Sequence, residues 1–466
     1  MPYQTVNPAT GLSVETHPYV SDRALDAAIG QAHAAFALWR QRPVGERAAV
    51  VSRAAALLRE KAEEYAQYLT LEVGKLIGEA RAEVGLSADI LDYYARNAET
   101  YLAAKPLPES PGAELHIEPV GVLVGIVPWN FPYYQIARVA GPQLMVGNTL
   151  LLKHAENVPR SALAFARLFE EAGAPAGVYT NLFASVEQIG RVIGDARVRG
   201  VTVTGSERAG ASVAEKAGHS LKKAVMELGG SDPMIVLEDA PLESALDAAL
   251  FGRMFNAGQT CVASKRLIVV GKARAGQFLQ GFVQRVKTLQ VGDPLDAQTT
   301  LGPVSSERAL SLLLDQIQRA RKAGAELVAG GKRVDRPGFY LEPTILSNIT
   351  PDNPIYTEEL FGPVASFYVV DDEAQAVQLA NATPFGLGAS VFTADLARGR
   401  KVAAVIESGM VFINQPAWTA PELPFGGVKN SGFGRELSML GFGEFVNQKL
   451  INVAPAGSPP WGPVKA

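Results

Sequence analysis

The amino-acid sequence predicts an α/β fold with two doubly wound domains. The chain has 466 residues, and at roughly 150 residues per domain this length allows about three structural units. Short runs of β-branched and apolar residues alternate with helical stretches from residue 120 onward, and a second such series begins near residue 233. Alternation of this kind is typical of parallel sheets covered by helices. We therefore expect two α/β domains that meet in a cleft.

The segments before residue 120 predict helices followed by an extended arm. Ser21 can cap an alanine-rich helix that runs to about residue 40, and a second helical block at 46–97 contains a break near Gly74. Prolines and a glycine interrupt any helix at 104–119, where apolar and polar residues then alternate. We expect this last segment to form an edge hairpin or arm.

The same patterns locate most elements of the two α/β series. In the first series, strands are expected at 120–127, 150–153, 178–182, 200–204 and 221–226, with helices at 160–172 and 207–217 among them. In the second series, the expected strands include 233–237, 266–270 and 410–414.

Composition and charge exclude several classes of protein. The chain is 47% hydrophobic and 19% charged with a net charge of −4, so it is neither disordered nor basic enough to attract nucleic acid. It has no apolar run of about 18 residues for a membrane span, and Glu15 and Asp22 stand where a signal peptide needs an apolar core. Its single cysteine, Cys261, cannot form an intramolecular disulfide, and five scattered histidines predict no metal site. We expect a cytoplasmic protein.

One glycine-containing turn has the context of a phosphate-binding site. Gly205-Ser-Glu-Arg-Ala-Gly210 follows a predicted strand and opens a predicted helix, where backbone N–H groups and Ser206 can bind a pyrophosphate. The turn matches neither G-x-G-x-x-G nor the P-loop pattern, so a plain helix cap explains it equally well.

Asn130 and Glu227 each follow a predicted strand. Pro128-Trp-Asn-Phe-Pro132 fixes the backbone around Asn130, whose amide can then hold an oxyanion; a simple turn is the alternative. Glu227 is followed by two glycines, which places its carboxylate in the cleft where α/β proteins bind ligands.

Cys261 lies in a polar turn. Gly258-Gln-Thr-Cys261 follows a helical stretch and precedes a strand. A lone cysteine is usually a small buried hydrophobe, but the polar residues before this one favour a catalytic thiol equally.

Five motifs in order carry a family resemblance. They lie at 128–132, 227–230, 258–261, 359–364 (Glu-Leu-Phe-Gly-Pro-Val) and 424–432 (Pro-Phe-Gly-Gly-Val-Lys-Asn-Ser-Gly). In this order they resemble the aldehyde dehydrogenase superfamily, and the resemblance covers essentially the whole chain.

The resemblance implies the superfamily's aldehyde dehydrogenase-like α/β architecture and assembly. Residues 1–100 and 120–228 would form the NAD-binding domain and 229–440 the catalytic domain. Residues 101–119 and 441–466 would form an oligomerisation arm and a C-terminal strand. A homodimer or homotetramer is expected.

The resemblance also implies catalysis by Cys261, Glu227 and Asn130. The Cys261 thiolate would attack an aldehyde to give a thiohemiacetal, whose oxyanion is held by the Asn130 side chain and the Cys261 N–H. Hydride transfer to the nicotinamide leaves a thioester, and Glu227 activates the water that hydrolyses it.

A nicotinamide cofactor follows from the same resemblance. NAD is expected over NADP, because the Glu156 carboxylate can accept a hydrogen bond from the ribose 2′-hydroxyl but repels a 2′-phosphate. The implied cofactor-binding residues are Val127, Trp129, Lys153, Glu156, Gly205, Ser206, Leu228, Glu359 and Phe361.

Within the superfamily the chain is most similar to bacterial succinate-semialdehyde dehydrogenases. Arg138, eight residues after Asn130, stands where those enzymes carry an arginine for the substrate carboxylate, and Thr419 is expected to add a hydroxyl. Phe255 and Ala263 stand where animal relatives carry a second arginine and a second cysteine. We therefore expect oxidation of the small-molecule aldehyde succinate semialdehyde to succinate.

Three other functions stay open on the sequence. The first is a dehydrogenase of aromatic or medium aliphatic aldehydes, because Phe255, Tyr133, Tyr134 and Trp418 can line an apolar channel. The second is a catalytically silent structural or binding paralogue. The third is a cysteine hydrolase that uses Glu227 and needs no NAD.

Overall fold

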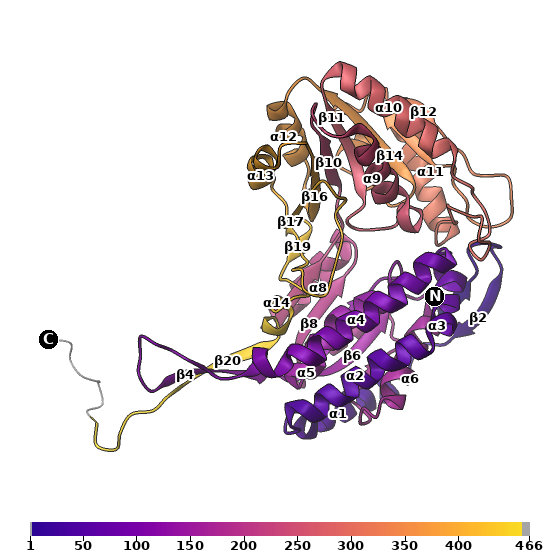
Figure 1. Ribbon diagram of the computed structural model, residues 1–466. Coiled ribbons are helices and arrows are strands. Elements are labelled where there is room, and N and C mark those ends of the chain that lie inside the picture. Colours follow the sequence, from indigo (N-terminus) through magenta and orange to yellow (C-terminus); the bar gives the residue numbers. More distant parts are fainter. Residues whose placement is uncertain (1, 459–466) are drawn as a thin grey trace.

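Two mostly parallel β-sheets organise residues 2–458, the part of the chain that the computed structural model describes (Figure 1). Within these residues, the first sheet has six strands and only its edge strand β19 (Gly432–Phe433) is antiparallel. Its order is β19, β9 (Lys223–Glu227), β8 (Val198–Thr204), β5 (Val122–Val127), β6 (Thr149–His154) and β7 (Tyr179–Asn181). The chain reverses direction along the sheet at β5, which lies between β6 and β8, and ligands bind at such switch points.

The second sheet has seven strands among the described residues, again with one antiparallel edge strand, β12 (Glu326–Ala329). The order continues with β13 (Thr344–Ser347), β14 (Val364–Val370), β11 (Ser264–Val270), β10 (Asp232–Val236), β16 (Gly388–Phe392) and β17 (Met410–Ile413). All the predicted strands are present within a few residues of their expected bounds. The prediction of two doubly wound α/β domains is confirmed.

Helices cover the sheets because the strands are apolar on both faces. In the first domain, α5 (Pro132–Val146) is buried along its whole length and connects β5 to β6. The other helices of this series are α6 (Pro159–Glu171), α7 (Val186–Gly194) and α8 (Glu207–His219). The second sheet carries α9 (Leu242–Met254), α10 (Lys272–Lys287), α11 (Glu307–Lys322), α12 (Glu373–Asn381) and α13 (Leu396–Val405).

The N-terminal segment is helical from residue 22 but not before it. Ser21 caps α1 (Asp22–Trp39) by accepting a hydrogen bond from Ala24 N–H, as predicted. The second helical block divides into α2 (Val44–Glu60), α3 (Ala62–Val73) and α4 (Ile77–Leu102), and Gly74 ends α3 with a left-handed φ of +79°. The expectation of helices throughout the first hundred residues is wrong near the start, where β1 (Tyr3–Val6) and β2 (Ser13–His17) form a hairpin.

The predicted arm is a small antiparallel sheet that projects from the body (Figure 1). It consists of β3 (Lys105–Pro106), β4 (Ala113–Pro119) and β20 (Val446–Asn452), with β4 in the middle. Residues 459–466 of the expected C-terminal strand segment lie outside the described residues. The expected domain boundary at residue 440 is displaced, because β19 belongs to the sheet of the first domain.

Short elements complete the chain. They are the antiparallel pair β15 (Phe385–Gly386) and β18 (Val428–Lys429), the single turn α14 (Leu440–Gly443), and the 3₁₀ turns Phe255–Gly258 and Pro354–Tyr356. Among the described residues, no helix combines the length and apolar character needed to cross a membrane.

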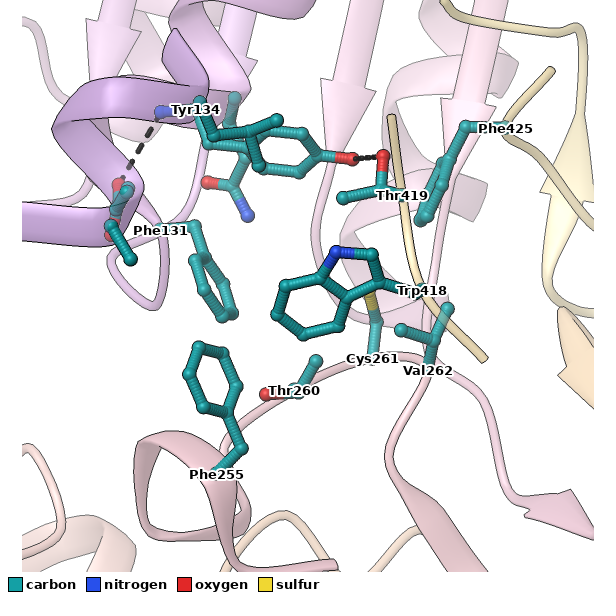
Figure 2. A pocket seen from close by; sticks show the side chains of 13 residues that line it. Phe131, Tyr134, Phe255, Thr260, Cys261, Val262, Trp418, Thr419 and Phe425 are labelled. Carbon is teal, nitrogen blue, oxygen red and sulfur yellow. Dashed lines mark hydrogen bonds between the residues drawn. The ribbon is translucent and has the colours of Figure 1, made fainter. Parts of the chain in front are cut away.

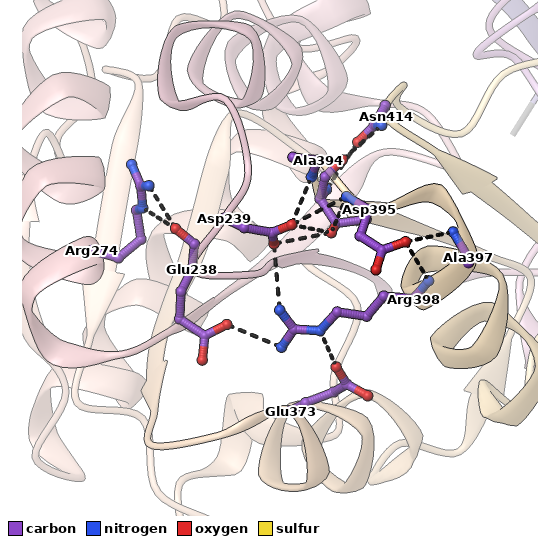
Figure 3. Close-up of polar contacts among 10 residues, drawn as sticks. Glu238, Asp239, Arg274, Glu373, Ala394, Asp395, Ala397, Arg398 and Asn414 are labelled. Carbon is purple, nitrogen blue, oxygen red and sulfur yellow. Dashed lines mark hydrogen bonds and ion pairs between the residues drawn. The ribbon is translucent and has the colours of Figure 1, made fainter.

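The carboxyl edge of the second sheet is filled by ion pairs (Figure 3). Arg398 of α13 lies 2.6 Å from Glu373, 3.1 Å from Glu238 and 3.5 Å from Asp239, and the last two residues follow β10. Thr393, after β16, donates a hydrogen bond to Asp239. The usual ligand-binding edge of this sheet is thus occupied by its own side chains, and the cleft lies at the other end of β10 and β11.

Candidate active site

The carboxyl edge of the first sheet gathers most residues that the sequence analysis selected. These strands are parallel, so residues that end or follow them lie along one edge. Val127, Trp129 and Asn130 end or follow β5, Lys153 lies near the end of β6, Gly205 and Ser206 follow β8, and Glu227 and Leu228 end and follow β9.

Cys261 comes from the second domain, on a loop that begins with a strained turn. Asn256, Ala257 and Gly258 are consecutive residues with left-handed φ values of +54°, +51° and +73°. The Asn256 side chain holds the turn by donating to the Asn130 carbonyl at 3.0 Å, and its backbone N–H donates to Glu79 at 3.0 Å. The nucleophile loop is therefore tied to both β5 and α4 of the first domain.

The Asn130 side chain is fixed by two hydrogen bonds. Its Nδ2 donates to the Gln259 carbonyl at 2.9 Å, and its Oδ1 accepts from Gln135 Nε2 at 2.8 Å. An amide nitrogen carries two hydrogens, so one N–H stays available for an oxyanion near Cys261.

The Glu83 carboxylate, near the start of α4, holds the backbone that follows Asn130. Glu83 accepts hydrogen bonds from the N–H groups of Tyr133 and Tyr134 at the start of α5, and it forms a buried ion pair with Lys75. The Lys75 ammonium lies 3.7 Å from the centre of the Phe131 ring. Helix α4 thus aligns the first turn of α5, which follows Asn130 directly.

An apolar pocket opens above Cys261, with a cavity volume of about 120 Å³ (Figure 2). Phe131 and Phe255 stack across one side with ring centres 6.1 Å apart, and Trp418 covers the sulfur in this view. On the opposite side the hydroxyls of Tyr134 and Thr419 are hydrogen-bonded at 2.8 Å. Two of the predicted substrate residues, Phe255 and Thr419, therefore line the pocket.

Arg138, the third predicted substrate residue, has a different partner. Its Nε lies 2.7 Å from the Glu436 carboxylate, and its Nη2 donates to Thr204 Oγ1 at 3.0 Å. It is 1% exposed, and its guanidinium lies over the rings of Tyr134 and Phe425, behind the pocket wall. Direct contact between Arg138 and a substrate carboxylate does not match this geometry, because Glu436 already neutralises the guanidinium.

Burial keeps the Cys261 thiol protonated at neutral pH. Loss of solvent raises the pKa of the free Cys261 thiol to about 11. The nearby Arg138 and Lys265 cations lower this pKa, whereas the carboxylates of Asp232 and Glu359 raise it. Because the thiolate is the nucleophilic form, the site needs a base or a change in its surroundings to react.

Burial also favours the neutral form of Glu227. Its carboxyl group is buried against Gly426, where a β-carbon would lie 2.8 Å from Glu227 Oε1. Burial, and then the neighbouring Glu436 carboxylate, raise the pKa of Glu227 well above its ordinary value. Contact with water would lower the pKa of Glu227 and leave it as the ionised carboxylate, the form that can accept a proton.

The cofactor-binding candidates fit a dinucleotide along the same edge. Lys153 Nζ lies 2.7 Å from Glu156, Ser206 caps α8, and Glu359 accepts a hydrogen bond from Gly230 N–H at 3.2 Å. Trp129 and Phe361 meet edge to face with ring centres 5.8 Å apart. A helix N-terminus and an acidic side chain are groups with which α/β proteins hold the pyrophosphate and the ribose of a dinucleotide.

The comparisons with known proteins identify the class. The aldehyde dehydrogenase family matches residues 1–451, and the chain belongs to this family. It is a nicotinamide-dependent aldehyde dehydrogenase, which confirms the expected enzyme class. Similar solved structures superpose with TM-scores up to 0.96, which confirms the predicted fold.

Several similar relatives share one named activity. The succinate-semialdehyde dehydrogenase [NADP(+)] of Deinococcus radiodurans is 51% identical, over 98% of this chain and 96% of its own length. A succinate-semialdehyde dehydrogenase [NADP(+)] 1 of Mycobacterium tuberculosis is 44% identical, over 97% of this chain and 100% of its own. The crystal structure of succinic semialdehyde dehydrogenase from Streptococcus pyogenes in complex with NADP+ has a TM-score of 0.95, 46% identity, and coverage of 97% and 99%. These names favour NADP(+) over the NAD that the sequence analysis expected.

Several supporting residues were not predicted from the sequence. Gln135 orients the Asn130 side chain, and Asn256 holds the nucleophile loop. Lys265 donates a hydrogen bond to the Cys261 carbonyl of that loop. Lys265 had a signal in the sequence: it lies at the start of a strand that ends in four apolar residues, and a buried cation there needs partners. Gln135 and Asn256 are ordinary polar residues in the sequence, and only the fold brings them to the site.

We predict that the rate at which iodoacetamide modifies Cys261 in the cofactor-free protein rises about tenfold for each pH unit between about pH 7 and 9. The reason is that the thiolate fraction rises about tenfold per pH unit below the pKa of about 11. Peptide mass spectrometry measures the adduct. Cys261→Ala should remove both the adduct and aldehyde oxidation while the protein stays folded. An inflection at or below the ordinary thiol value of 9.0 would contradict the buried state.

Proposed function

We propose that this enzyme oxidises succinate semialdehyde to succinate with NADP(+), through a thioester on Cys261. The observation that carries the proposal is the position of Cys261 in the lining of an apolar pocket, two residues after the Gln259 carbonyl that holds the Asn130 amide. The named activity of the relatives supports the substrate.

The side chains supply each step apart from hydride acceptance. The Cys261 sulfur bonds to the aldehyde carbon, its proton leaves to Glu227 or water, and the new oxyanion accepts hydrogen bonds from Asn130 Nδ2 and the Cys261 N–H. A bound nicotinamide supplies the hydride acceptor. Any thiol proton held by Glu227 first passes to solvent. The Glu227 carboxylate then takes a proton from water, whose oxygen attacks the thioester carbon, and the C–S bond breaks to release the acid and a Cys261 thiolate that regains a proton.

We propose that the Tyr134 and Thr419 hydroxyls recognise the substrate carboxylate. They face the pocket as a pair, and either one can turn its O–H toward a carboxylate. Arg138 Nη1 donates to the Tyr134 oxygen at 3.4 Å and strengthens that hydroxyl as a donor. In this view Arg138 acts through Tyr134 rather than by direct contact.

A second candidate substrate class is uncharged aromatic or medium aliphatic aldehydes. Phe251, Phe255 and Trp418 form a mutual ring cluster beside the pocket, with ring centres 5.2–5.4 Å apart. Such rings favour an apolar chain and give a carboxylate no ionic partner.

Cofactor choice depends on the Lys153–Glu156 ion pair. Glu156 is 40% exposed, so its carboxylate can turn into solvent and leave Lys153 to a 2′-phosphate. We propose that NADP(+) binds with its 2′-phosphate on Lys153. Separating Lys153 from Glu156 then costs part of the binding free energy of NADP(+).

We also propose that the arm joins subunits of a homo-oligomer. On β20, Leu450 and Ile451 are exposed apolar residues, as is the following Val453. A projecting strand with such side chains is suited to pair with a second copy.

Glu227→Gln should slow thioester hydrolysis more than hydride transfer. The expected pattern is a burst of about one NADPH per active site, followed by steady turnover roughly a hundredfold or more below wild type, as for loss of a general base. Stopped-flow absorbance of NADPH measures both phases. An unchanged steady rate would return Glu227 to a structural role.

Tyr134→Phe should lower kcat/KM for succinate semialdehyde roughly tenfold to a hundredfold, the value of one hydrogen bond to a charged group. Butanal, which lacks the carboxylate, should be affected less than about threefold because it makes no such bond. Tyr133→Phe is the matched control, since that hydroxyl lies outside the pocket lining. Equal losses on both aldehydes, or a wild type that favours butanal, would support the uncharged class instead.

Glu156→Ser should raise kcat/KM for NADP(+) by about tenfold and leave that for NAD within about threefold. The carboxylate near the 2′-phosphate costs less than the roughly 4 kcal/mol of two close unit charges, because Glu156 is partly exposed. Initial rates with each cofactor measure the effect. No gain with NADP(+) would show that Glu156 does not face the 2′-position.

A further inference from the structure

Lys265 is a buried cation that contacts the nucleophile loop from inside the protein. It lies in β11 and is 1% exposed. Its Nζ donates to the carbonyl of Cys261 at 2.7 Å and to the carbonyl of Thr260 at 3.0 Å. The same Nζ lies 3.1 Å from Glu359 Oε1. All three partners belong to the proposed catalytic and cofactor sites.

The bond to Thr260 sets the direction of the Cys261 N–H. A trans peptide is planar, so the Thr260 C=O and the Cys261 N–H point in opposite directions. The Thr260 oxygen accepts hydrogen bonds from both Lys265 Nζ and Ala263 N–H, the latter at 3.1 Å. With the carbonyl held toward the interior, the N–H is directed toward the pocket, which Thr260 and Cys261 both line.

We propose that Lys265 is a positioning residue, which aims the Cys261 N–H at the substrate oxyanion and links the nucleophile loop to Glu359. The role rests on the proposed thioester mechanism. Lysine suits it because one ammonium donates three hydrogen bonds, and the three partners here are two carbonyls and one carboxylate.

The charge of Lys265 also acts on the thiol. Glu359 neutralises part of that charge, so loss of the lysine and loss of the carboxylate should change thiol reactivity in opposite directions. The groups that face or act on Cys261 are Arg138 and Tyr134 of α5, Asp232 of β10, Lys265 of β11, and Glu359 before β14.

Lys265→Met tests the role with a variant of similar length but no charge. Iodoacetamide should modify Cys261 of the cofactor-free variant about tenfold more slowly than in wild type at the same pH, because the cation that favours the thiolate is gone. In the oxidation assay, kcat should fall about tenfold or more while KM for the aldehyde stays within about twofold, since the N–H acts on the oxyanion. Wild-type alkylation and kcat would overturn the proposal.

Lys222→Met is the matched control. Lys222 also donates to two backbone carbonyls, those of Ile193 and Asp195, but it precedes β9 at the end opposite Glu227. Its loss should leave alkylation and kcat as in wild type. If this control slows both as strongly as Lys265→Met, the effect is general destabilisation and the proposal fails.

Glu359→Gln keeps the test decisive if Lys265→Met does not fold. Removal of the carboxylate leaves Lys265 less neutralised, so iodoacetamide should modify Cys261 about threefold or more faster than in wild type. Unchanged or slower modification would overturn the link. Alkylation needs no aldehyde, so the two proposals can fail separately. A protein that shows the expected alkylation but oxidises no succinate semialdehyde would refute the proposed substrate. The action of Lys265 on the thiol would still hold.

Discussion

The hydrogen bond from the Asn256 side chain to the Asn130 carbonyl joins the two domains where the chemistry takes place. Two of the three consecutive left-handed residues, Asn256 and Ala257, are not glycine, and each carries a conformational cost on the order of 1–3 kcal/mol. Buried hydrogen bonds from Asn130 to Gln259, and from Asn256 N–H to Glu79, hold this turn in place. The position of the nucleophile therefore depends on contacts between domains rather than on the loop alone.

Burial favours the protonated form of both reacting groups. It raises the pKa of the Cys261 thiol to about 11 and that of the Glu227 carboxyl well above its ordinary value. A neutral thiol is a poor nucleophile and resists oxidation, which protects the only cysteine of the chain. The thiol therefore becomes reactive only when water, substrate or cofactor changes the surroundings of Cys261 and Glu227. The fixed amide of Asn130, by contrast, needs no reorganisation.

The sequence predicted the long buried strands and the reactive residues better than it predicted the short strands. Apolar runs located β5, β6 and β8, because strands buried on both faces have a strong pattern. The two-residue strand β19 and the N-terminal hairpin carried too little pattern to be recognised. Both are defined by pairing in the folded chain, which a local pattern does not report.

The same limit explains why the ion pair of Arg138 was not predicted. Its position after Asn130 indicated a substrate ligand, but Glu436 lies far along the chain and only the fold brings it within 2.7 Å. The Glu436 carboxylate offsets the cost of burying the Arg138 guanidinium, and the ion pair holds this side chain behind the pocket wall. The preference between NAD and NADP(+) was hard to predict from the sequence for a related reason. Glu156 suggested NAD when considered alone, yet it is paired with Lys153 and partly exposed.

Trapping the covalent intermediate tests the central claim most directly. The protein would be mixed with succinate semialdehyde and NADP(+), quenched in acid within the first turnover, digested, and analysed by mass spectrometry. The account predicts a succinyl group on the peptide that contains Cys261, formed only when the oxidised cofactor is present. A succinyl group on another residue, or product formation with Cys261 unmodified at every quench time, would contradict it.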